Sequence, residues 1–174
     1  RAEQGASLVV APASVVLNWQ NEIMRFAPAL RVSIFNDAED RKSVIDSQDK
    51  YDVLLCTYGL LARETEMLSK KEWNVVCLDE AHTIKNRSTK MSAAAMALQS
   101  KARLLLTGTP IQNHLGELWN LMEFLNPGLL GSFEAFRTQF ILPIEQEQNT
   151  EKRTALRRII QPFILRRTKT DVLS

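Results

Sequence analysis

Short apolar runs alternate with stretches of helical periodicity from the start of the chain to residue 106. Apolar runs of strand length lie at residues 8–11, 31–35, 52–57, 74–78 and 103–106. Helical periodicity fills the intervals, at residues 14–26, 37–47, 59–69 and 88–98. In the first helix Val15, Trp19, Ile23 and Phe26 share one face, and Ser14 can provide the N-terminal cap. This alternation predicts an α/β fold in which helices flank a parallel, doubly wound sheet.

The strand pattern ends after Pro110. We expect three further helices, at residues 115–125, 133–140 and 151–160. The run Asn126-Pro127-Gly128 ends the first of them, and a polar loop around residues 146–149 joins the other two. The sequence therefore predicts an α/β domain over residues 1–113 and an all-helical segment over residues 114–174.

Two adjacent carboxylates, Asp79 and Glu80, follow the apolar run at residues 75–78 directly. Parallel sheets place their ligand sites at the carboxyl ends of such buried strands. Paired acids there cost desolvation free energy unless a cation or hydrogen bonds compensate them. The usual cation is Mg²⁺ carried by a nucleoside triphosphate, which an Asp holds while a neighbouring Glu orients water. The alternative interpretation is a pair of solvated loop acids.

A second polar cluster, Thr107-Gly108-Thr109-Pro110, follows the last apolar run. Hydroxyl groups beside a glycine can donate to a phosphate or contact the acidic end of a neighbouring strand. An ordinary strand-to-helix turn would have the same composition, so this cluster alone leaves both interpretations open.

Composition indicates a globular protein, with 45% hydrophobic and 24% charged residues. The apolar runs are far shorter than the ~20 residues of a membrane span, so we expect no membrane partner. Cys56 and Cys77 lie within apolar runs and are interpreted as buried small hydrophobes, which weakly favours an intracellular location. His82 and His114 are the only histidines and have no metal-binding spacing, which speaks against a zinc hydrolase.

The net charge of +2 is too small to establish a nucleic-acid partner. Basic residues are concentrated in one acid-free stretch, residues 152–169, at Lys152, Arg153, Arg157, Arg158, Arg166, Arg167 and Lys169. This stretch is either a solvated helix face or a contact for a phosphate backbone or another domain.

Several segments, in the same order, resemble the motifs of Swi/Snf-type ATPases of helicase superfamily two. Residues 78–82 (Leu-Asp-Glu-Ala-His) resemble motif II, and residues 107–113 (Thr-Gly-Thr-Pro-Ile-Gln-Asn) resemble motif III. Residues 8–19, together with Glu22, resemble motif Ia, and residues 57–59 resemble motif Ib. Residues 161–169 resemble the end of the family's first lobe. The resemblance covers essentially the whole chain, and the spacing is most similar to the bacterial branch.

The resemblance implies the RecA-like first lobe of a double-stranded-DNA translocase that hydrolyses ATP between two lobes. It implies that Asp79 coordinates Mg²⁺, through water, and that Glu80 positions the hydrolytic water. It further implies that His82 and Gln112 couple the ATP site to motif III and that Thr107 lies near the nucleotide. The candidates for the DNA-facing surface are Pro12, Ser14, Thr57, Tyr58, Lys85, Asn86 and Thr109. The location would be cytoplasmic and nucleoid-associated in a bacterium, or nuclear in a eukaryote.

None of the six glycines is followed by lysine, so a phosphate-binding loop is not present in this sequence. The resemblance places that loop upstream of Arg1 and the second lobe downstream of Ser174. We therefore expect this fragment neither to bind ATP tightly nor to hydrolyse it, and we expect its exposed apolar surface to promote self-association.

Two other functions are alternatives to a DNA translocase. A catalytically silent module could keep this fold for binding DNA or protein, although it would have no need for both Asp79 and Glu80. An RNA helicase is the third hypothesis, and residues 107–110 together with Lys85-Asn86 speak against it.

Overall fold

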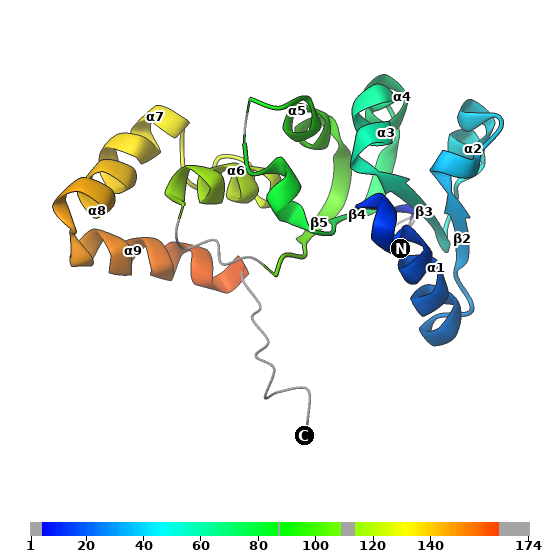
Figure 1. Cartoon of the computed structure of the whole chain (residues 1–174), viewed down its shortest axis with the longest axis horizontal. Coiled ribbons are helices and arrows are strands. Elements are labelled where there is room, and N and C mark those ends of the chain that lie inside the picture. The colour runs from blue at the N-terminus through cyan, green and yellow to red at the C-terminus, as the bar shows by residue number, and fades with distance from the viewer. Residues whose placement is uncertain (1–4, 87, 109–113, 164–174) are drawn as a thin grey trace. The chain divides into compact units, whose positions relative to one another are not determined.

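The computed structural model describes residues 5–86, 88–108 and 114–163 of the 174-residue chain (Figure 1). The chain divides into two compact units, Arg1–Pro127 and Gly128–Ser174, and each is described by itself. The first unit extends beyond the predicted boundary at residue 113 because it includes the helix at residues 115–125.

The first unit is built on a five-stranded sheet with the order β2-β3-β1-β4-β5, and every neighbouring pair is parallel. The parallel α/β sheet predicted from the sequence is confirmed. The strands are β1 (Ser7–Ala11), β2 (Arg31–Ile34), β3 (Asp52–Thr57), β4 (Glu72–Leu78) and β5 (Gln99–Leu105).

Strands β4 and β5 begin earlier than the apolar runs suggest. Their first residues pair across the sheet, Glu72 with Gln99 and Trp73 with Ser100. The apolar runs miss these positions because Glu72, Gln99 and Ser100 are polar, and Glu72 and Gln99 are exposed at the starts of their strands. Strand β5 is the last strand of the sheet among the described residues, and Leu104 and Leu106 at that edge are 54% and 43% exposed. Exposed apolar residues at a sheet edge favour association with another chain. The self-association expected from the sequence stays a prediction.

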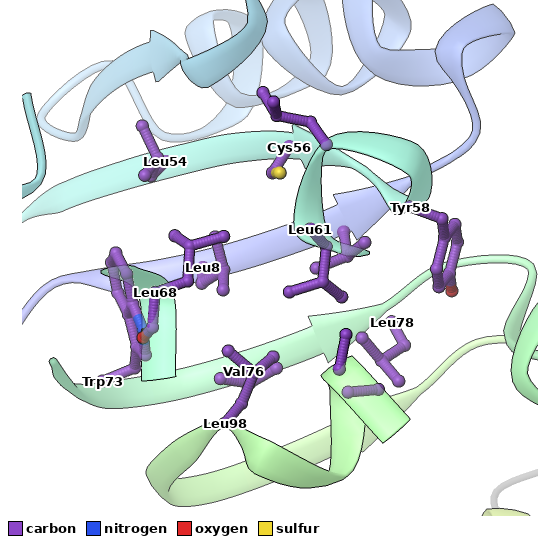
Figure 2. Close-up of a cluster of buried hydrophobic side chains, with 14 of the residues drawn as sticks. Leu8, Leu54, Cys56, Tyr58, Leu61, Leu68, Trp73, Val76, Leu78 and Leu98 are labelled. Carbon is purple, nitrogen blue, oxygen red and sulfur yellow. The ribbon is translucent and has the colours of Figure 1, made fainter. Parts of the chain in front are cut away.

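Alternate residues of the central strands β1, β3 and β4 pack in two clusters on opposite faces of the sheet, as the two-residue repeat of a strand requires. Val9 and Ala11 pack in a cluster with residues of α1 (Ala13–Phe26). Leu8 and Val10 pack in the larger cluster with residues of α3 (Tyr58–Arg63) and α5 (Lys90–Ala97). Figure 2 shows this larger cluster, with side chains from β1, β3 and β4 gathered against those of the covering helices.

Helix α1 ends at Phe26, as predicted, but its cap and the packing of its last residue differ from the prediction. Pro12 occupies the N-cap position without a side-chain hydrogen bond, so Ser14 lies inside the helix and does not cap it. Val15, Trp19 and Ile23 pack on the sheet as expected. Phe26 does not, because it is the last residue of the helix and is 69% exposed.

Three other helices have different bounds because local side-chain hydrogen bonds set where they begin. The expected helix at residues 37–47 is a 3₁₀ turn, η1 (Phe35–Asp37), followed by α2 (Arg41–Ser47), which the Asp40 carboxylate caps at Ser43 N. The Thr89 hydroxyl caps α5 by accepting from Ser92 N. Residues 59–69 divide at Glu64 into α3 and α4 (Thr65–Ser69), where the Thr65 hydroxyl donates to the carbonyls of Leu61 and Ala62.

Helix α6 (Leu115–Leu125) has the predicted bounds and belongs to the first unit. Arg103 of β5 holds it in place. Its guanidinium donates to the carbonyl of Phe124 at 2.7 Å and to that of Leu98 at 2.9 Å. The bond to Phe124 connects β5 to the end of α6, and the bond to Leu98 connects β5 to the end of α5.

The second unit is helical, as predicted. A continuous helical run comprises α7 (Phe133–Phe136), a π-helical turn (Arg137–Ile141) and α8 (Leu142–Glu147). It ends at Gln148, whose φ of 51° is left-handed. The Asn149 side chain then caps α9 (Thr150–Ile160), so the polar loop is shorter than expected. The final 3₁₀ turn, η5 (Gln161–Phe163), precedes the residues outside the described part.

Both cysteines are buried, as expected, and burial raises the pKa of each thiol to about 12. Neither thiol therefore forms a significant fraction of thiolate near neutral pH. Within the described residues, no helix has both the length and the apolar character needed to span a membrane.

Candidate functional site

Asp79 and Glu80 lie at the carboxyl edge of the sheet, between the ends of β1 and β5. The N–H of Asp79 donates to the carbonyl of Val10 at 2.8 Å. On the other side, Leu106 N donates to the Leu78 carbonyl and Ala81 N donates to the Leu106 carbonyl, both at 2.9 Å. Strand pairing thus continues on both sides of the acid pair and fixes its backbone.

Three donors hold Asp79. The N–H of Glu80 donates to Oδ1 and the indole N–H of Trp19 donates to Oδ2, each at 2.8 Å. The hydroxyl of Tyr58 donates to the backbone carbonyl of Asp79 at 2.5 Å. Burial, reinforced by the nearby Asp79 carboxylate, raises the pKa of Tyr58, so the phenol remains a neutral donor. The orientation of Asp79 is therefore determined from both the backbone and the side chain.

Glu80 has a left-handed backbone, with φ of 49° and ψ of 52°. This conformation is uncommon for a residue with a side chain, and residues held in it are enriched at functional sites. The Glu80 carbonyl accepts from Thr83 N at 3.0 Å and from its hydroxyl at 2.9 Å. These bonds stabilise the turn into the 3₁₀ helix η2 (Ala81–Ile84) and leave the Glu80 carboxylate outside the core, 44% exposed.

His82 lies beside this carboxylate. Its Nδ1 is 3.2 Å from Glu80 Oε2, but the two atoms do not form a hydrogen bond, and Nδ1 is buried without a partner. The contact becomes an ion pair only when the imidazole is protonated. The His82 imidazole is therefore in direct contact with the Glu80 carboxylate.

The acid pair suits a magnesium ion better than a metal held entirely by protein. Mg²⁺ keeps several waters and takes one or two carboxylates together with substrate phosphates. Asp79 and Glu80 supply two carboxylates, and nowhere in the described residues do three or more His, Cys, Asp or Glu side chains form a metal-binding group. The donor set fits a cation that arrives with a phosphate ligand.

The predicted motif III is only partly described. Thr107 follows Leu106, so it lies on the same edge of the sheet as Asp79 and is partly exposed. Gln112 and Thr109 lie outside the described residues.

The predicted DNA-facing residues occupy several elements at this edge. Ala11 pairs with Thr57, so Pro12 and Ser14 follow β1 beside the start of α3. Thr57 Oγ1 accepts from Leu60 N, capping α3, and from the Asn36 amide at 2.9 Å. Tyr58 is only 4% exposed as a whole residue, so it lies in the core and offers almost no surface to DNA.

Lys85 and Asn86 follow η2. The ammonium of Lys85 is 3.5 Å from Glu117 of α6, and its side chain remains 50% exposed. The Asn86 side-chain oxygen accepts from Ser88 N at 3.0 Å and from Ser88 Oγ at 2.7 Å, which shapes the turn toward α5.

Comparison with known proteins assigns the chain to a family. Residues 1–174 match the family described as SNF2-related domain. The chain belongs to this family. Its fold matches the Sulfolobus solfataricus SWI2/SNF2 ATPase core in complex with dsDNA, with a TM-score of 0.84 and 48% identity over 94% of this chain and 34% of that one. The RecA-like fold expected from the sequence is thereby confirmed.

Other relatives of this SNF2-related domain come from bacteria and eukaryotes. Bacillus subtilis YwqA is 42% identical over 94% of this chain and 18% of its own length. The ISWI chromatin-remodeling complex ATPase CHR11 of Arabidopsis thaliana is 38% identical over 99% of this chain and 17% of its own length. The chain thus spans less than a fifth of the length of these curated relatives.

Sequence reasoning missed two residues of this SNF2-related domain that form hydrogen bonds with Asp79 or with the turn that follows Glu80. Trp19 was assigned only to the packed face of α1, although it also contacts Asp79. Asn120 is 2% exposed, and its amide donates to the carbonyl of Ile84 and to Ser92 Oγ. A polar residue among the apolar positions of α6 was the available signal for Asn120, whereas nothing local indicated the Trp19 contact.

Proposed function

We propose that this chain is part of an ATP-dependent double-stranded-DNA translocase and supplies the Mg²⁺-and-water half of its ATP site. The observation that carries the proposal is the Asp79–Glu80 pair at the carboxyl edge of the sheet, where Asp79 is held by three donors and Glu80 is half-exposed. The family supports it, since SNF2-related relatives include a chromatin-remodeling ATPase and an ATPase core in complex with dsDNA.

Asp79 and Glu80 would have different roles, one in binding the cation and the other in activating water. The Asp79 carboxylate would hold the Mg²⁺ of Mg·ATP through water, and the bound cation would neutralise charge on the phosphates. The Glu80 carboxylate would orient the attacking water and accept its proton. Its exposed position suits this role, because it is free of the hydrogen bonds that hold Asp79. Thr107, on the same edge, would lie near the nucleotide, and His82 and Gln112 would couple the site to motif III.

The DNA-facing surface would comprise Pro12, Ser14, Thr57, Lys85, Asn86 and Thr109, while the buried Tyr58 would support it from the core. Contacts from such hydroxyl, amide and ammonium groups fall on phosphates and carry little sequence information. DNA binding should therefore be nonspecific and should weaken as salt rises. The phosphate-binding loop and a second RecA-like lobe would come from the longer protein, which would act at the nucleoid or in the nucleus.

Replacing Glu117 with glutamine should tighten binding of duplex DNA to the full-length protein about two- to fivefold at low salt. Glu117 competes with phosphate for Lys85, and an exposed ion pair of this kind is worth about 0.2–1 kcal/mol. Fluorescence anisotropy with a labelled duplex measures the change.

Glu66→Gln is the matched control. It also removes one negative charge and breaks an exposed ion pair, that with Lys70 at 2.8 Å, away from the proposed surface. It should have a smaller effect than Glu117→Gln. Equal effects from the two variants would mean that Lys85 does not contact DNA, and absence of duplex binding by the wild-type protein would refute the DNA partner.

A further inference from the structure

Trp19 connects Asp79 to α1, a helix that is far from Asp79 in the sequence. Its indole N–H donates to Asp79 Oδ2 at 2.8 Å, across 60 positions of sequence. The ring itself packs with Val15 and Ile23 against the sheet face formed by Val9, Ala11 and Cys77. Packing therefore fixes the ring in α1, and the ring presents its single donor to the carboxylate.

The other donor to this carboxylate provides no comparable anchor. The N–H of Glu80 bonds to Oδ1, but Glu80 is the next residue and moves with Asp79. Tyr58 bonds to the backbone carbonyl and leaves the side-chain torsions free. Among the hydrogen bonds of the described residues, the Trp19 bond is the one that joins the Asp79 carboxylate to another element of the fold.

We propose that Trp19 is a positioning residue that fixes the Asp79 carboxylate in the rotamer required for Mg²⁺, an inference that rests on the proposed function. Each carboxylate oxygen can accept two hydrogen bonds, so one acceptor site on each oxygen remains for cation-bound water. Hydrogen bonds to a charged acceptor are stronger than neutral ones. Outer partners that orient a ligand typically change metal affinity about 10–100-fold when they are lost.

The test uses Trp19→Phe in the full-length protein, which keeps an aromatic ring against the sheet but removes the N–H. The measurement is equilibrium binding of a fluorescent, non-hydrolysable ATP analogue at increasing Mg²⁺ concentration, so the readout does not depend on turnover. We expect the Mg²⁺ concentration for half-maximal binding to rise about tenfold. Binding of the analogue without Mg²⁺ should not change, because Trp19 acts only through Asp79.

Trp73→Phe is the matched control. It also deletes an indole donor, the one that bonds to the Leu68 carbonyl at 3.1 Å, but at the opposite end of β4. It should leave the Mg²⁺ requirement unchanged even if it lowers the melting temperature. If Trp19→Phe fails to fold, 3-benzothienylalanine at position 19 replaces the N–H with sulfur in a ring of nearly the same shape, and the same tenfold change is expected.

An unchanged Mg²⁺ requirement in a folded Trp19 variant, with Asp79→Asn losing its Mg²⁺ dependence, would overturn the positioning role and leave the proposed function intact. A wild-type protein whose nucleotide binding is unaffected by Asp79→Asn would instead refute the proposed function, and the role of Trp19 with it. A rise in the Mg²⁺ requirement for Trp19→Phe, absent in Trp73→Phe, supports the inference.

Discussion

Replacing Glu80 with glutamine should abolish ATP turnover by the full-length protein while ATP binding is retained. Loss of a positioned general base lowers the rate by roughly 10²–10⁴-fold. The fold should tolerate the change, because the structural contacts of Glu80 use its backbone carbonyl, which accepts from Thr83, whereas its side chain is 44% exposed. Phosphate release in steady state measures turnover, and equilibrium titration measures ATP binding.

Glu72→Gln provides the matched control for this experiment. Glu72 is exposed and begins β4 at the edge of the sheet opposite to Glu80. The control should hydrolyse ATP at the wild-type rate. Full activity in Glu80→Gln would show that the acid pair does not perform the chemistry, and loss of ATP binding would show that Glu80 acts in binding instead.

Replacing Asn120 with leucine should lower the free energy of unfolding by about 2–5 kcal/mol, since each buried polar group left without a partner costs about 1–3 kcal/mol. The substitution keeps a side chain of similar length but leaves the Ile84 carbonyl and the Ser92 hydroxyl without the Asn120 donor. Both Asn120 and Ser92 are buried, at 2% and 1% exposure, so water cannot easily replace the amide. Urea denaturation of the 174-residue chain measures the change.

Asn21→Leu is the control for Asn120→Leu, because Asn21 lies on the exposed side of α1. A surface change of this kind should alter stability by no more than about 0.5 kcal/mol. The role of Asn120 in joining α6 to the turn after the acid pair would be contradicted if the two variants were equally stable.

The sequence predicted the sheet well because its central strands are buried on both faces. The run at residues 52–57 has the bounds of β3, and its first five residues are buried. Helix α6 was predicted with correct bounds because its apolar periodicity is strong and Asn126-Pro127 follows it. Element starts were less predictable, because they depend on which of several polar residues makes the capping bond: Asp40 caps α2 and Thr89 caps α5.

The sequence predicted the acid pair of the candidate site but not the residues that hold it, because only the acid pair has a local signal. Asp79 and Glu80 stand out because an apolar run ends in two acids, a signal contained in adjacent residues. The contacts of Asp79 with Trp19 and Tyr58 are not local, since they join residues 60 and 21 positions apart. Only the tertiary packing of α1 and α3 on opposite faces of the sheet brings these donors to the acid.

The ATP hydrolysis rate of the full-length protein, with duplex DNA, with RNA of the same length or with neither, tests the central claim most directly. The account predicts a low rate without nucleic acid, marked stimulation by duplex DNA and little by RNA. Stimulation by RNA as strong as by DNA would contradict a double-stranded-DNA translocase, and absence of hydrolysis under all three conditions would contradict an ATPase.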